Sequence, residues 1–590
     1  MPFRVPGAPR WRVVLASLLL ALAPAPPALA AAQGPVERPA APAVDAPLGR
    51  PKGAAIASAN AQATDAGMAV LRAGGNAFDA AVAVSAALGL VEPESSGLGG
   101  GGFFLLRRAS DGKVVFVDAR ERAPLAATRD MYLDPATGEP RPRQTIDGAL
   151  AAAIPGLPAG LVHVSATYGR MPLGEALAPV IRLAERGWRF GDKNIAMMGW
   201  RKDVLRDDPG ASALFLIDGE VPAAGTRMRN RDYADVLRRL AAEGHDGFYR
   251  GPVAQRLVDG VRAAGGIWTL EDLAEYRVVE RAPLVFTHRG QAVVTAPPPS
   301  SGGVALAATL QILDGYDWAN ESPVDRLHLR IEAMRRAYRD RAIFLGDPDF
   351  VDVPVELLTH PAYAAGLRAS ISTERATPSA LLPGVTRSER PDTTHFSIVD
   401  AEGNIAAVTQ TVNLPYGNAM VVPGTGFLLN NEMDDFSVKP GVPNAFGLVG
   451  EDANAIAPGK RPLSSMTPTI VIGMDRVAVV GTPGGSRIIS MVIQGLLALD
   501  AGASAAEAVA EPRVHHQYLP DEVSIEPGAL DAATRAALEA RGHVVKEEPR
   551  TWGNMQVVLW HRDDGRVEAG ADPRWKTVGK GSTDEGGIFR

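Results

Sequence analysis

The stretch "PDTTHFSIVD", residues 391–400, places two threonines and a histidine at the start of an alternating apolar run. β-Branched residues and a period of two are typical of a strand. A turn at "AEGN" (401–404) and a second alternating run, "IAAVTQTV" (405–412), complete the pattern of an antiparallel hairpin. Upstream, residues 372–392 have no apolar period and carry three prolines, which predicts an exposed connector. The hairpin therefore starts directly after a segment in which the chain can be cut.

Thr393 is the first residue of this hairpin, so a cut after Asp392 would free its α-amine. A threonine hydroxyl is a weak nucleophile and needs a base. The peptide nitrogen of an internal threonine is not basic, whereas a free α-amine has a pKa of about 7.7–8.0. The residues thus admit two interpretations, an N-terminal nucleophile released from a proenzyme or an ordinary strand. On the partner strand Thr409, Thr411 and Asn413 share one face, but this spacing alone does not decide between the two.

Composition limits the possible functions. The chain has 590 residues, of which 46% are hydrophobic and 22% charged, so it can form a sizeable core of more than one ordinary domain. Its net charge of -7 and the lack of a basic run give no reason to expect nucleic acid as a partner. The sequence has no cysteine, which excludes cysteine catalysis and thiolate metal sites.

The N-terminal segment has the pattern of a secretory signal. Three arginines precede the apolar run "VVLASLLLALA" (13–23), and "PAPPALA" (24–30) offers small residues for cleavage near Ala30. Residues 1–30 are therefore predicted to be a signal peptide, and the Ala- and Pro-rich residues 31–50 a flexible leader. We expect a soluble periplasmic or secreted protein without a membrane anchor.

The first part of the chain is predicted to be rich in helices. Residues 57–88 have helical spacing of small and apolar side chains with one break at the glycines 74–75. The glycines Gly97, Gly99 and Gly102 form the pattern G-x-G-x-x-G, but they follow a helical pattern and open an apolar strand. A dinucleotide-binding motif requires the reverse context, so we expect tight backbone turns here and no nucleotide site.

Several separated blocks resemble one known family. "TTHFSIVDAEGNIAAVTQTVN" (393–413), "LLNNEMDDFS" (428–437), "KRPLSSMTPTIV" (460–471) and "GTPGGSR" (481–487) are similar to the γ-glutamyltranspeptidases. "DAGMAVLRAGGNAFDAAVA", "VDARERAP", "PPPSSGG" and "FLGDPDF" extend the resemblance through the first part, from about residue 50 to the C-terminus. These enzymes are self-processing N-terminal-nucleophile hydrolases. The resemblance implies an α+β fold, a four-layer αββα sandwich built jointly by a large subunit (51–392) and a small subunit (393–590).

The resemblance also implies the site residues. Thr393 would be the autoprocessing residue and nucleophile, and Thr411 would orient it. The backbone N–H groups of Gly484 and Gly485 would form the oxyanion hole. The substrate-binding residues would be Arg120, Ser464 and Ser465 for an α-carboxylate, Glu432 and Asp435 for an α-ammonium, and Asn413 for holding the donor. Arginine suits a carboxylate because it donates two parallel hydrogen bonds.

The implied activity is γ-glutamyl transfer and glutathione hydrolysis without a cofactor. Thr393 would form a γ-glutamyl ester from glutathione or another γ-glutamyl donor, and water or an amino-acid or peptide acceptor would resolve it. The alternatives are a cephalosporin acylase that cleaves glutaryl groups, a peptidoglycan or capsule transpeptidase, and a scaffold that never processes itself. A glutaryl group has no α-ammonium, so Glu432 and Asp435 favour the glutamyl substrate.

Two further features complete the predictions. Residues 436–460 resemble a lid loop of bacterial relatives that carry tyrosine where this chain has Phe446. A phenyl ring cannot hydrogen-bond Asn413, so we expect a different closing contact. The run "HHQ" (515–517) is predicted to be structural, since adjacent histidines rarely face one metal ion.

Overall fold

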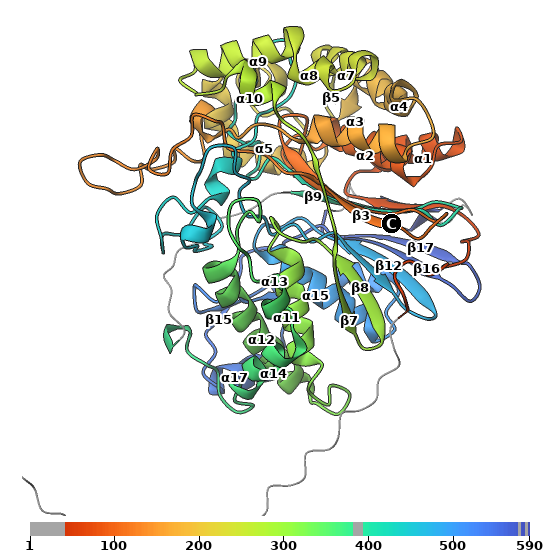
Figure 1. The fold of residues 1–590 in the computed structure, drawn as a ribbon, viewed down its shortest axis with the longest axis vertical. Helices are drawn as coiled ribbons and strands as arrows, with labels where there is room; N and C mark the ends of the chain where they lie inside the picture. The colour runs from red at the N-terminus through yellow and green to blue at the C-terminus, as the bar shows by residue number, and fades with distance from the viewer. Residues whose placement is uncertain (1–41, 382–392, 576–579, 584–587, 590) are drawn as a thin grey trace, which may run out of the picture. The chain divides into compact units, whose positions relative to one another are not determined.

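The computed structural model describes residues 42–381, 393–575, 580–583 and 588–589 (Figure 1). The predicted signal peptide, the first part of the leader and Asp392 lie outside the described residues. Among the described helices, none combines the length and apolar character that a membrane span requires.

Two packed helices open the fold, as the sequence predicts. Helix α1 spans Ala61–Arg72 and α2 spans Ala77–Val91, and every residue of α2 is buried. The side chain of Asn76 accepts hydrogen bonds from the first turn of α2, while Asp79 accepts one from the Asn76 backbone N–H. Such a reciprocal cap satisfies backbone donors at a helix start. Gly74, with φ of 95°, ends α1 in a conformation that favours glycine.

The first sheet has eight strands and contains the predicted hairpin at its centre. Its order is β19 (Ile588–Phe589), β18 (Lys580–Thr583), β1 (Ala55–Ser58), β9 (Thr394–Val399), β10 (Ile405–Thr411), β2 (Gly101–Arg107), β3 (Val114–Ala119) and β6 (Val279–Arg281). Strands β9 and β10 pair antiparallel, with Thr409 opposite His395. Both neighbours of this hairpin, β1 and β2, precede residue 392 in the chain.

The second sheet has six strands and packs against the first. Its order is β17 (Val567–Ala571), β16 (Gln556–His561), β12 (Arg476–Gly481), β11 (Thr469–Ile472), β8 (Gln291–Thr295) and β7 (Leu284–His288). Figure 1 shows α1, α2 and α3 (Leu157–Tyr168) over the first sheet, and α11 (Gly302–Leu313), α12 (Pro323–Phe344) and α15 (Arg487–Asp500) beyond the second. The prediction of an αββα sandwich with strands from both sides of residue 392 is confirmed.

The remaining elements surround these layers. The other helices are α3 (Leu157–Tyr168), α4 (Leu173–Arg186), α5 (Asp192–Asp207), α6 (Pro209–Phe215), α7 (Arg231–Glu243), α8 (Asp246–Tyr249), α9 (Gly251–Ala263), α10 (Leu270–Ala274), α13 (Val355–Leu358), α14 (Pro361–Ala369), α16 (Ala505–Ala510) and α17 (Ala532–Ala540). The short strands are β4 (Trp188–Arg189), β5 (Arg227–Met228), β13 (Val514–His515), β14 (Val523–Ile525) and β15 (Val545–Glu547).

The glycine-rich run before β2 allows close backbone contact beside the hairpin. A Cβ atom on Gly99 would lie 2.0 Å from the carbonyl oxygen of Leu428, and one on Gly100 would lie 2.0 Å from that of Thr411. Only glycine permits this approach. The backbone of these glycines therefore packs directly against the end of β10 and against Leu428, which is the close backbone approach that glycine allows.

Two segments predicted to be exposed or flexible are partly packed. Ser379, within the predicted connector, is buried, and its backbone N–H donates to Asp521 over 2.7 Å. At the end of the leader, the Arg107 guanidinium donates to the carbonyl oxygens of Val44 and Ala46, and Leu48 is buried in the core. The composition did not reveal these contacts because their partners come from distant parts of the chain.

Candidate functional site

Alternation along β9 decides which way Thr393 faces. Phe396 and Ile398 pack into the hydrophobic cluster that β9 shares with α1 and α2. The opposite set faces the second sheet, because the Ser397 hydroxyl donates to the carbonyl oxygen of Val479 in β12 over 3.0 Å. Thr393 lies four residues before Ser397, so along an extended chain its side chain lies on the same face. It is 4% exposed. Its side chain thus lies between the two sheets, at one edge of the core.

The hydroxyl of Thr411 is held next to that of Thr393. The two side-chain oxygens are 3.4 Å apart, and the backbone N–H of Asn413 donates to the Thr411 oxygen over 2.7 Å. The Asn413 carboxamide donates to the carbonyl oxygen of Asn431 over 2.8 Å. The structure therefore brings Thr393, Thr411 and Asn413 together, as the shared face on the second strand predicts.

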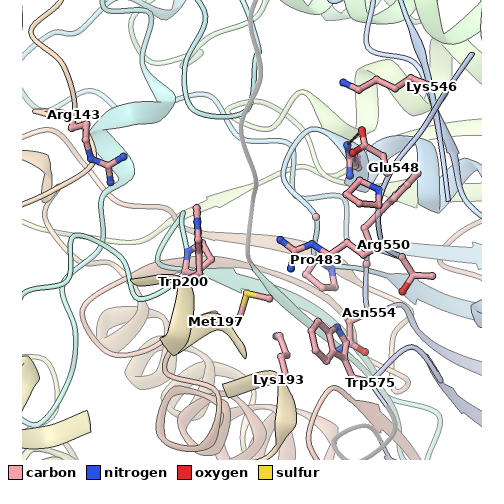
Figure 2. Close-up of a pocket in the computed structure, with 17 residues that line it drawn as sticks. Arg143, Lys193, Met197, Trp200, Pro483, Lys546, Glu548, Arg550, Asn554 and Trp575 are labelled. Atoms are coloured by element: carbon pink, nitrogen blue, oxygen red, sulfur yellow. Dashed lines mark hydrogen bonds and ion pairs between the residues drawn. The ribbon is translucent and has the colours of Figure 1, made fainter. Parts of the chain in front are cut away.

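A buried charged group anchors the residue that follows Thr393. The Thr394 hydroxyl donates to the Glu92 carboxylate over 2.9 Å, at the C-terminal end of α2. The Lys193 ammonium, on α5 (Figure 2), lies 3.3 Å from the same carboxylate and donates to Ser95 over 2.7 Å. Sequence reasoning missed this contact, although charged residues directly after a mainly apolar helix were a usable signal.

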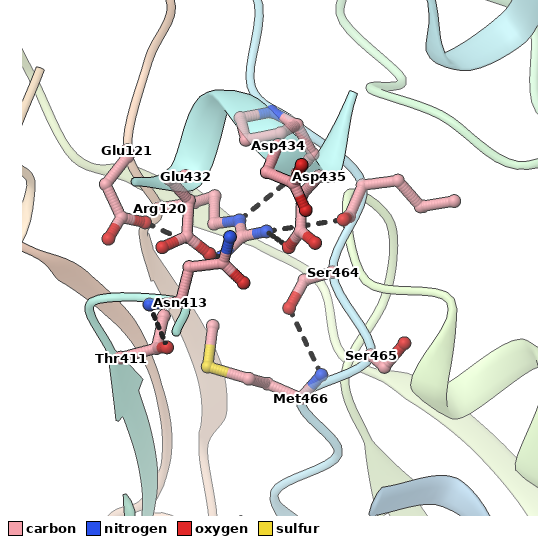
Figure 3. A network of polar contacts seen from close by, with 12 residues as sticks. Arg120, Glu121, Thr411, Asn413, Glu432, Asp434, Asp435, Ser464, Ser465 and Met466 are labelled. Carbon is pink, nitrogen blue, oxygen red and sulfur yellow. Dashed lines mark hydrogen bonds and ion pairs between the residues drawn. The ribbon is translucent and has the colours of Figure 1, made fainter. Parts of the chain in front are cut away.

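Arg120 follows β3 and is surrounded by carboxylates (Figure 3). Its guanidinium forms ion pairs with Glu432 and with Asp435, the latter at 2.5 Å, and is 1% exposed. It also donates to the carbonyl oxygens of Pro462 and Leu463 over 3.1 and 3.3 Å. These contacts fix the plane of the guanidinium, which is the condition for recognising a carboxylate with two parallel hydrogen bonds.

A third carboxylate makes the cluster rich in negative charge. Glu121, which sequence reasoning missed, is buried, and one of its oxygens lies 3.6 Å from the Arg120 guanidinium. Burial raises the pKa of Glu121 to about 7. Burial also raises the pKa of Glu432 and that of Asp435, against the opposing charge of Arg120. Three carboxylates share one guanidinium, so the cluster favours an added cation such as an ammonium group.

The two serines lie on the opposite wall of the site. The carbonyl oxygen of Ser464 accepts hydrogen bonds from the backbone and hydroxyl of Ser301, and the Ser464 hydroxyl accepts one from Met466 over 3.1 Å. The Ser465 hydroxyl accepts from the guanidinium of Arg341, on α12, over 3.4 Å. Arg341 is buried, which lowers its pKa to about 10. This second arginine was also missed by sequence reasoning.

Gly484 and Gly485 form the turn between β12 and α15. Their φ angles are 143° and 52°, and a Cβ atom on Gly484 would lie 2.5 Å from the Cε atom of Met491. The turn leads directly into the N-terminus of α15 at Arg487. Helix N-termini carry partial positive charge and favour anions.

These residues surround one small cavity. Its volume is about 20 Å³, enough for one water molecule. Every site residue predicted from the sequence lines it except Gly484, which lines a larger neighbouring cavity: Arg120, Thr393, Thr411, Asn413, Glu432, Asp435, Ser464, Ser465 and Gly485. Asp434 points elsewhere and accepts from Thr145 over 2.7 Å.

Phe446 lies over the same cavity and is 6% exposed. Its position is fixed through the backbone, since its N–H donates to Asn444 over 3.0 Å and its carbonyl oxygen accepts from Gln517 over 3.2 Å. The phenyl ring contributes an apolar wall, and Asn413 instead bonds the backbone of Asn431.

No group of three or more potential metal ligands occurs among the described residues. In the "HHQ" run, the His515 ring contacts Ser490 over 2.8 Å and Gln517 over 2.9 Å. These contacts agree with the structural interpretation of the run.

Comparison with known proteins gives the family. The family model described as Gamma-glutamyltranspeptidase matches residues 63–582. This chain belongs to the γ-glutamyltranspeptidase family. It is 41% identical to the glutathione hydrolase proenzyme of Escherichia coli, over 95% of this chain and 97% of that protein. It is 44% identical to the glutathione hydrolase proenzyme of a Pseudomonas species, over 84% and 87% of the two chains.

A solved structure supports the fold assignment. The cephalosporin acylase from Bacillus halodurans superposes with a TM-score of 0.78 at 27% identity, covering 90% of this chain and 96% of that chain. Proteins similar to this chain thus include both glutathione hydrolases and an acylase, so the choice between these substrates rests on the residues of the site.

Proposed function

We propose that the protein is an autoprocessed γ-glutamyltransferase and glutathione hydrolase with Thr393 as its nucleophile. The observation that carries this proposal is the position of Arg120. It lies between Glu432 and Asp435, in the same cavity as the Thr393 hydroxyl. A buried guanidinium beside excess carboxylates provides complementary partners for both charged groups of an α-amino acid head.

The first step is the maturation of the precursor. The Thr393 hydroxyl attacks the carbonyl carbon of the preceding peptide bond, the C–N bond breaks, and the nitrogen becomes the α-amine of Thr393. Water then hydrolyses the resulting ester and releases the new carboxyl terminus. The products stay associated, because β9 remains paired with β1 and β10 with β2, from the other side of the cut.

The second step is acyl transfer from the donor. Arg120 binds the α-carboxylate with Ser464 and Ser465, and Glu432 and Asp435 bind the α-ammonium. The free α-amine accepts the proton of the Thr393 hydroxyl, whose oxygen attacks the γ-carbonyl carbon. The N–H groups of Gly484 and Gly485 stabilise the oxyanion, and Thr411 orients the nucleophile. The amine leaves with the proton, and water or an acceptor amine cleaves the γ-glutamyl ester.

An acylase that cleaves glutaryl groups is the second candidate, favoured by the likeness to the Bacillus halodurans structure. A glutaryl group offers a carboxylate to Arg120 but nothing cationic to the carboxylate cluster. With a glutaryl substrate, the three carboxylates beside Arg120 would have no role in binding it. The glutamyl substrate therefore accounts for more of the site.

The test combines intact mass with two chromogenic amides. We expect purified protein to give two masses with a new N-terminus at Thr393, and to cleave γ-glutamyl-p-nitroanilide at least 100-fold faster than glutaryl-p-nitroanilide. Thr393→Ala should give one uncut mass and no turnover. A faster glutaryl reaction would establish the acylase instead, and an uncut active wild type would exclude the N-terminal nucleophile. Release of the mature protein from intact bacterial cells by osmotic shock would indicate a periplasmic location, and its recovery from the culture medium would indicate secretion.

A further inference from the structure

A second arginine lies behind the two serines of the small cavity. Arg341, in the last turn of α12, is 5% exposed. Its guanidinium donates to the Ser301 hydroxyl over 3.0 Å and to the Ser465 hydroxyl over 3.4 Å. Both of these partners are neutral. A buried charge is costly unless an opposite charge accompanies it, so two hydroxyls alone do not account for a guanidinium at this position.

The carboxylate whose charge acts most strongly on Arg341 already belongs to another arginine. Burial lowers the pKa of Arg341 to about 10, and the negative charge of Asp435 opposes this decrease. Asp435 forms its own ion pair with Arg120 at 2.5 Å. The C-terminal end of α12 also favours a cation, because the last carbonyl groups of a helix carry partial negative charge. An anion bound at the serines would complete this arrangement.

Through the two hydroxyls, Arg341 reaches both serines of the proposed glutamyl pocket. The Ser301 hydroxyl accepts from Arg341 and donates to the carbonyl oxygen of Ser464 over 2.7 Å. The backbone N–H of Ser301 donates to the same oxygen over 2.8 Å. Ser301 belongs to the segment "PPPSSGG" (297–303), which the catalytic steps do not use. This segment therefore connects the end of α12 to the serine pair.

The contact with Arg341 also directs the proton of Ser465. A serine hydroxyl that accepts a hydrogen bond from a guanidinium keeps its own proton for another acceptor. Ser465 lines the same small cavity as Arg120 and Thr393, whereas Arg341 does not line it. A positive charge behind the hydroxyl strengthens the hydrogen bond that it donates. A substrate carboxylate at this wall would thus meet one guanidinium directly and a second one through Ser465.

We infer that Arg341 is a positioning residue for the α-carboxylate of the γ-glutamyl donor, and that it makes the enzyme select donors in which this carboxylate is free. The inference rests on the proposed function and adds a second cation to the same pocket. Arg120 binds the carboxylate directly, whereas Arg341 acts through Ser465 and, by way of Ser301, through Ser464. The bound carboxylate supplies the negative charge that the two hydroxyl partners of Arg341 lack.

The experiment compares two donors that differ only at the α-carboxyl group. They are γ-glutamyl-p-nitroanilide and its α-carboxamide, hydrolysed by the mature enzyme without an acceptor. Arg341→Met and Arg341→Gln both remove the charge, and the glutamine keeps a hydrogen-bond donor, so one measurement remains if the other variant does not fold. Arg341→Lys keeps the charge. The control is Arg336→Met, which removes an equally buried arginine of α12 that donates to Glu332 and Ser370, outside the cavity.

We expect Arg341→Met and Arg341→Gln to lower kcat/KM for the carboxylate donor about 10-fold, mainly by raising KM. The value for the carboxamide donor should change less than about 2-fold, because that donor brings no charge to the site. Arg341→Lys should keep most of the preference for the carboxylate. Arg336→Met should lower the melting temperature and leave the preference unchanged.

A double-mutant cycle tests the path through Ser465. In the Ser465→Ala background, Arg341→Met should lower kcat/KM for the carboxylate donor only about 3-fold, since part of its effect passes through the missing hydroxyl. An undiminished 10-fold effect there would overturn the inference. So would equal losses on both donors, or a lysine variant that loses the preference as fully as the methionine variant. These outcomes leave the proposed function intact, whereas a wild type that does not cleave γ-glutamyl-p-nitroanilide would overturn both.

Discussion

The hydroxyl oxygens of Thr393 and Thr411 lie 3.4 Å apart across two neighbouring strands. The backbone N–H of Asn413 already donates to the Thr411 oxygen, so the Thr411 proton is directed towards another acceptor. A hydroxyl held in this way restricts the rotation of the Thr393 side chain. The pair therefore links the register of the hairpin to the orientation of the Thr393 hydroxyl, the proposed nucleophile.

Replacing Thr411 by valine tests this link. Valine keeps the branched shape and removes only the hydroxyl, so we expect the mature enzyme to lose about 10- to 100-fold in kcat with little change in KM. Thr411→Ser should retain most of the activity. Steady-state kinetics with γ-glutamyl-p-nitroanilide provide the measurement. Wild-type activity in Thr411→Val together with a loss in Thr411→Ser would mean that the methyl group, and not the hydroxyl, is required.

The contact between Thr394 and Glu92 predicts an effect on maturation. Thr394→Val leaves a buried carboxylate oxygen without its hydroxyl donor, at a cost of about 1–3 kcal/mol. Because Thr394 directly follows the proposed nucleophile, we expect precursor cleavage to slow about 10-fold. A time course of intact mass after purification measures the rate.

Thr394→Ser keeps the hydroxyl and should mature at nearly the wild-type rate. Glu92→Gln should slow cleavage as Thr394→Val does, since both changes weaken the same contact. Thermal melting of the uncut Thr393→Ala background separates stability from maturation. Wild-type cleavage in Thr394→Val with a lowered melting temperature would assign the contact to stability alone.

Arginine at position 120 is expected to be irreplaceable by lysine. An ammonium cannot contact two carboxylates, two carbonyl oxygens and a substrate carboxylate in one plane. The loss of one charged hydrogen bond costs about 1.5–3 kcal/mol, so Arg120→Lys should lower kcat/KM about 10- to 100-fold or more. Arg122→Lys is the matched control, because Arg122 lies outside the cavity and contacts the carbonyl oxygen of Asp272. Similar kinetics for the two variants would contradict the assignment.

The raised pKa of Glu121 predicts a pH-dependent stability. Its pKa rises from 4.5 to about 7 on folding, so the folded state holds the proton more tightly than the unfolded state. The free energy of unfolding should therefore fall as pH rises from about 4.5 to about 7, by up to about 3 kcal/mol. Glu121→Gln removes this titration.

Urea unfolding of the uncut Thr393→Ala background, with and without Glu121→Gln, measures the effect. We expect the glutamine variant to gain stability relative to its parent between pH 5 and pH 8. The exposed Glu374→Gln controls for the loss of a carboxylate at the surface. An unchanged difference at the two pH values would show that Glu121 does not release its proton in this range.

The parts of the fold that could be predicted are those with local signals. The break at Gly74 and Gly75, the cap at Asn76 and the alternating hairpin all follow from neighbours along the chain. Most site residues were found only through the resemblance to the family, because a lone arginine or serine pair carries no periodic signal. Glu121 and Arg341 were missed for the same reason. Their roles depend on partners that come from other strands and helices.

By itself the sequence determined the hairpin, the helix break at Gly74 and Gly75 and the presence of a threonine directly after a connector. Each of these depends on backbone preferences within a few residues. Only the tertiary structure decided that Thr393 faces the second sheet, since a shift of one residue in β9 would turn it towards α2. Only the tertiary structure brings Arg120, which follows β3, to Glu432 and Asp435 in the turn that follows β10. The physical reason is that long-range register is fixed by burial of both sheet faces, which no local pattern encodes.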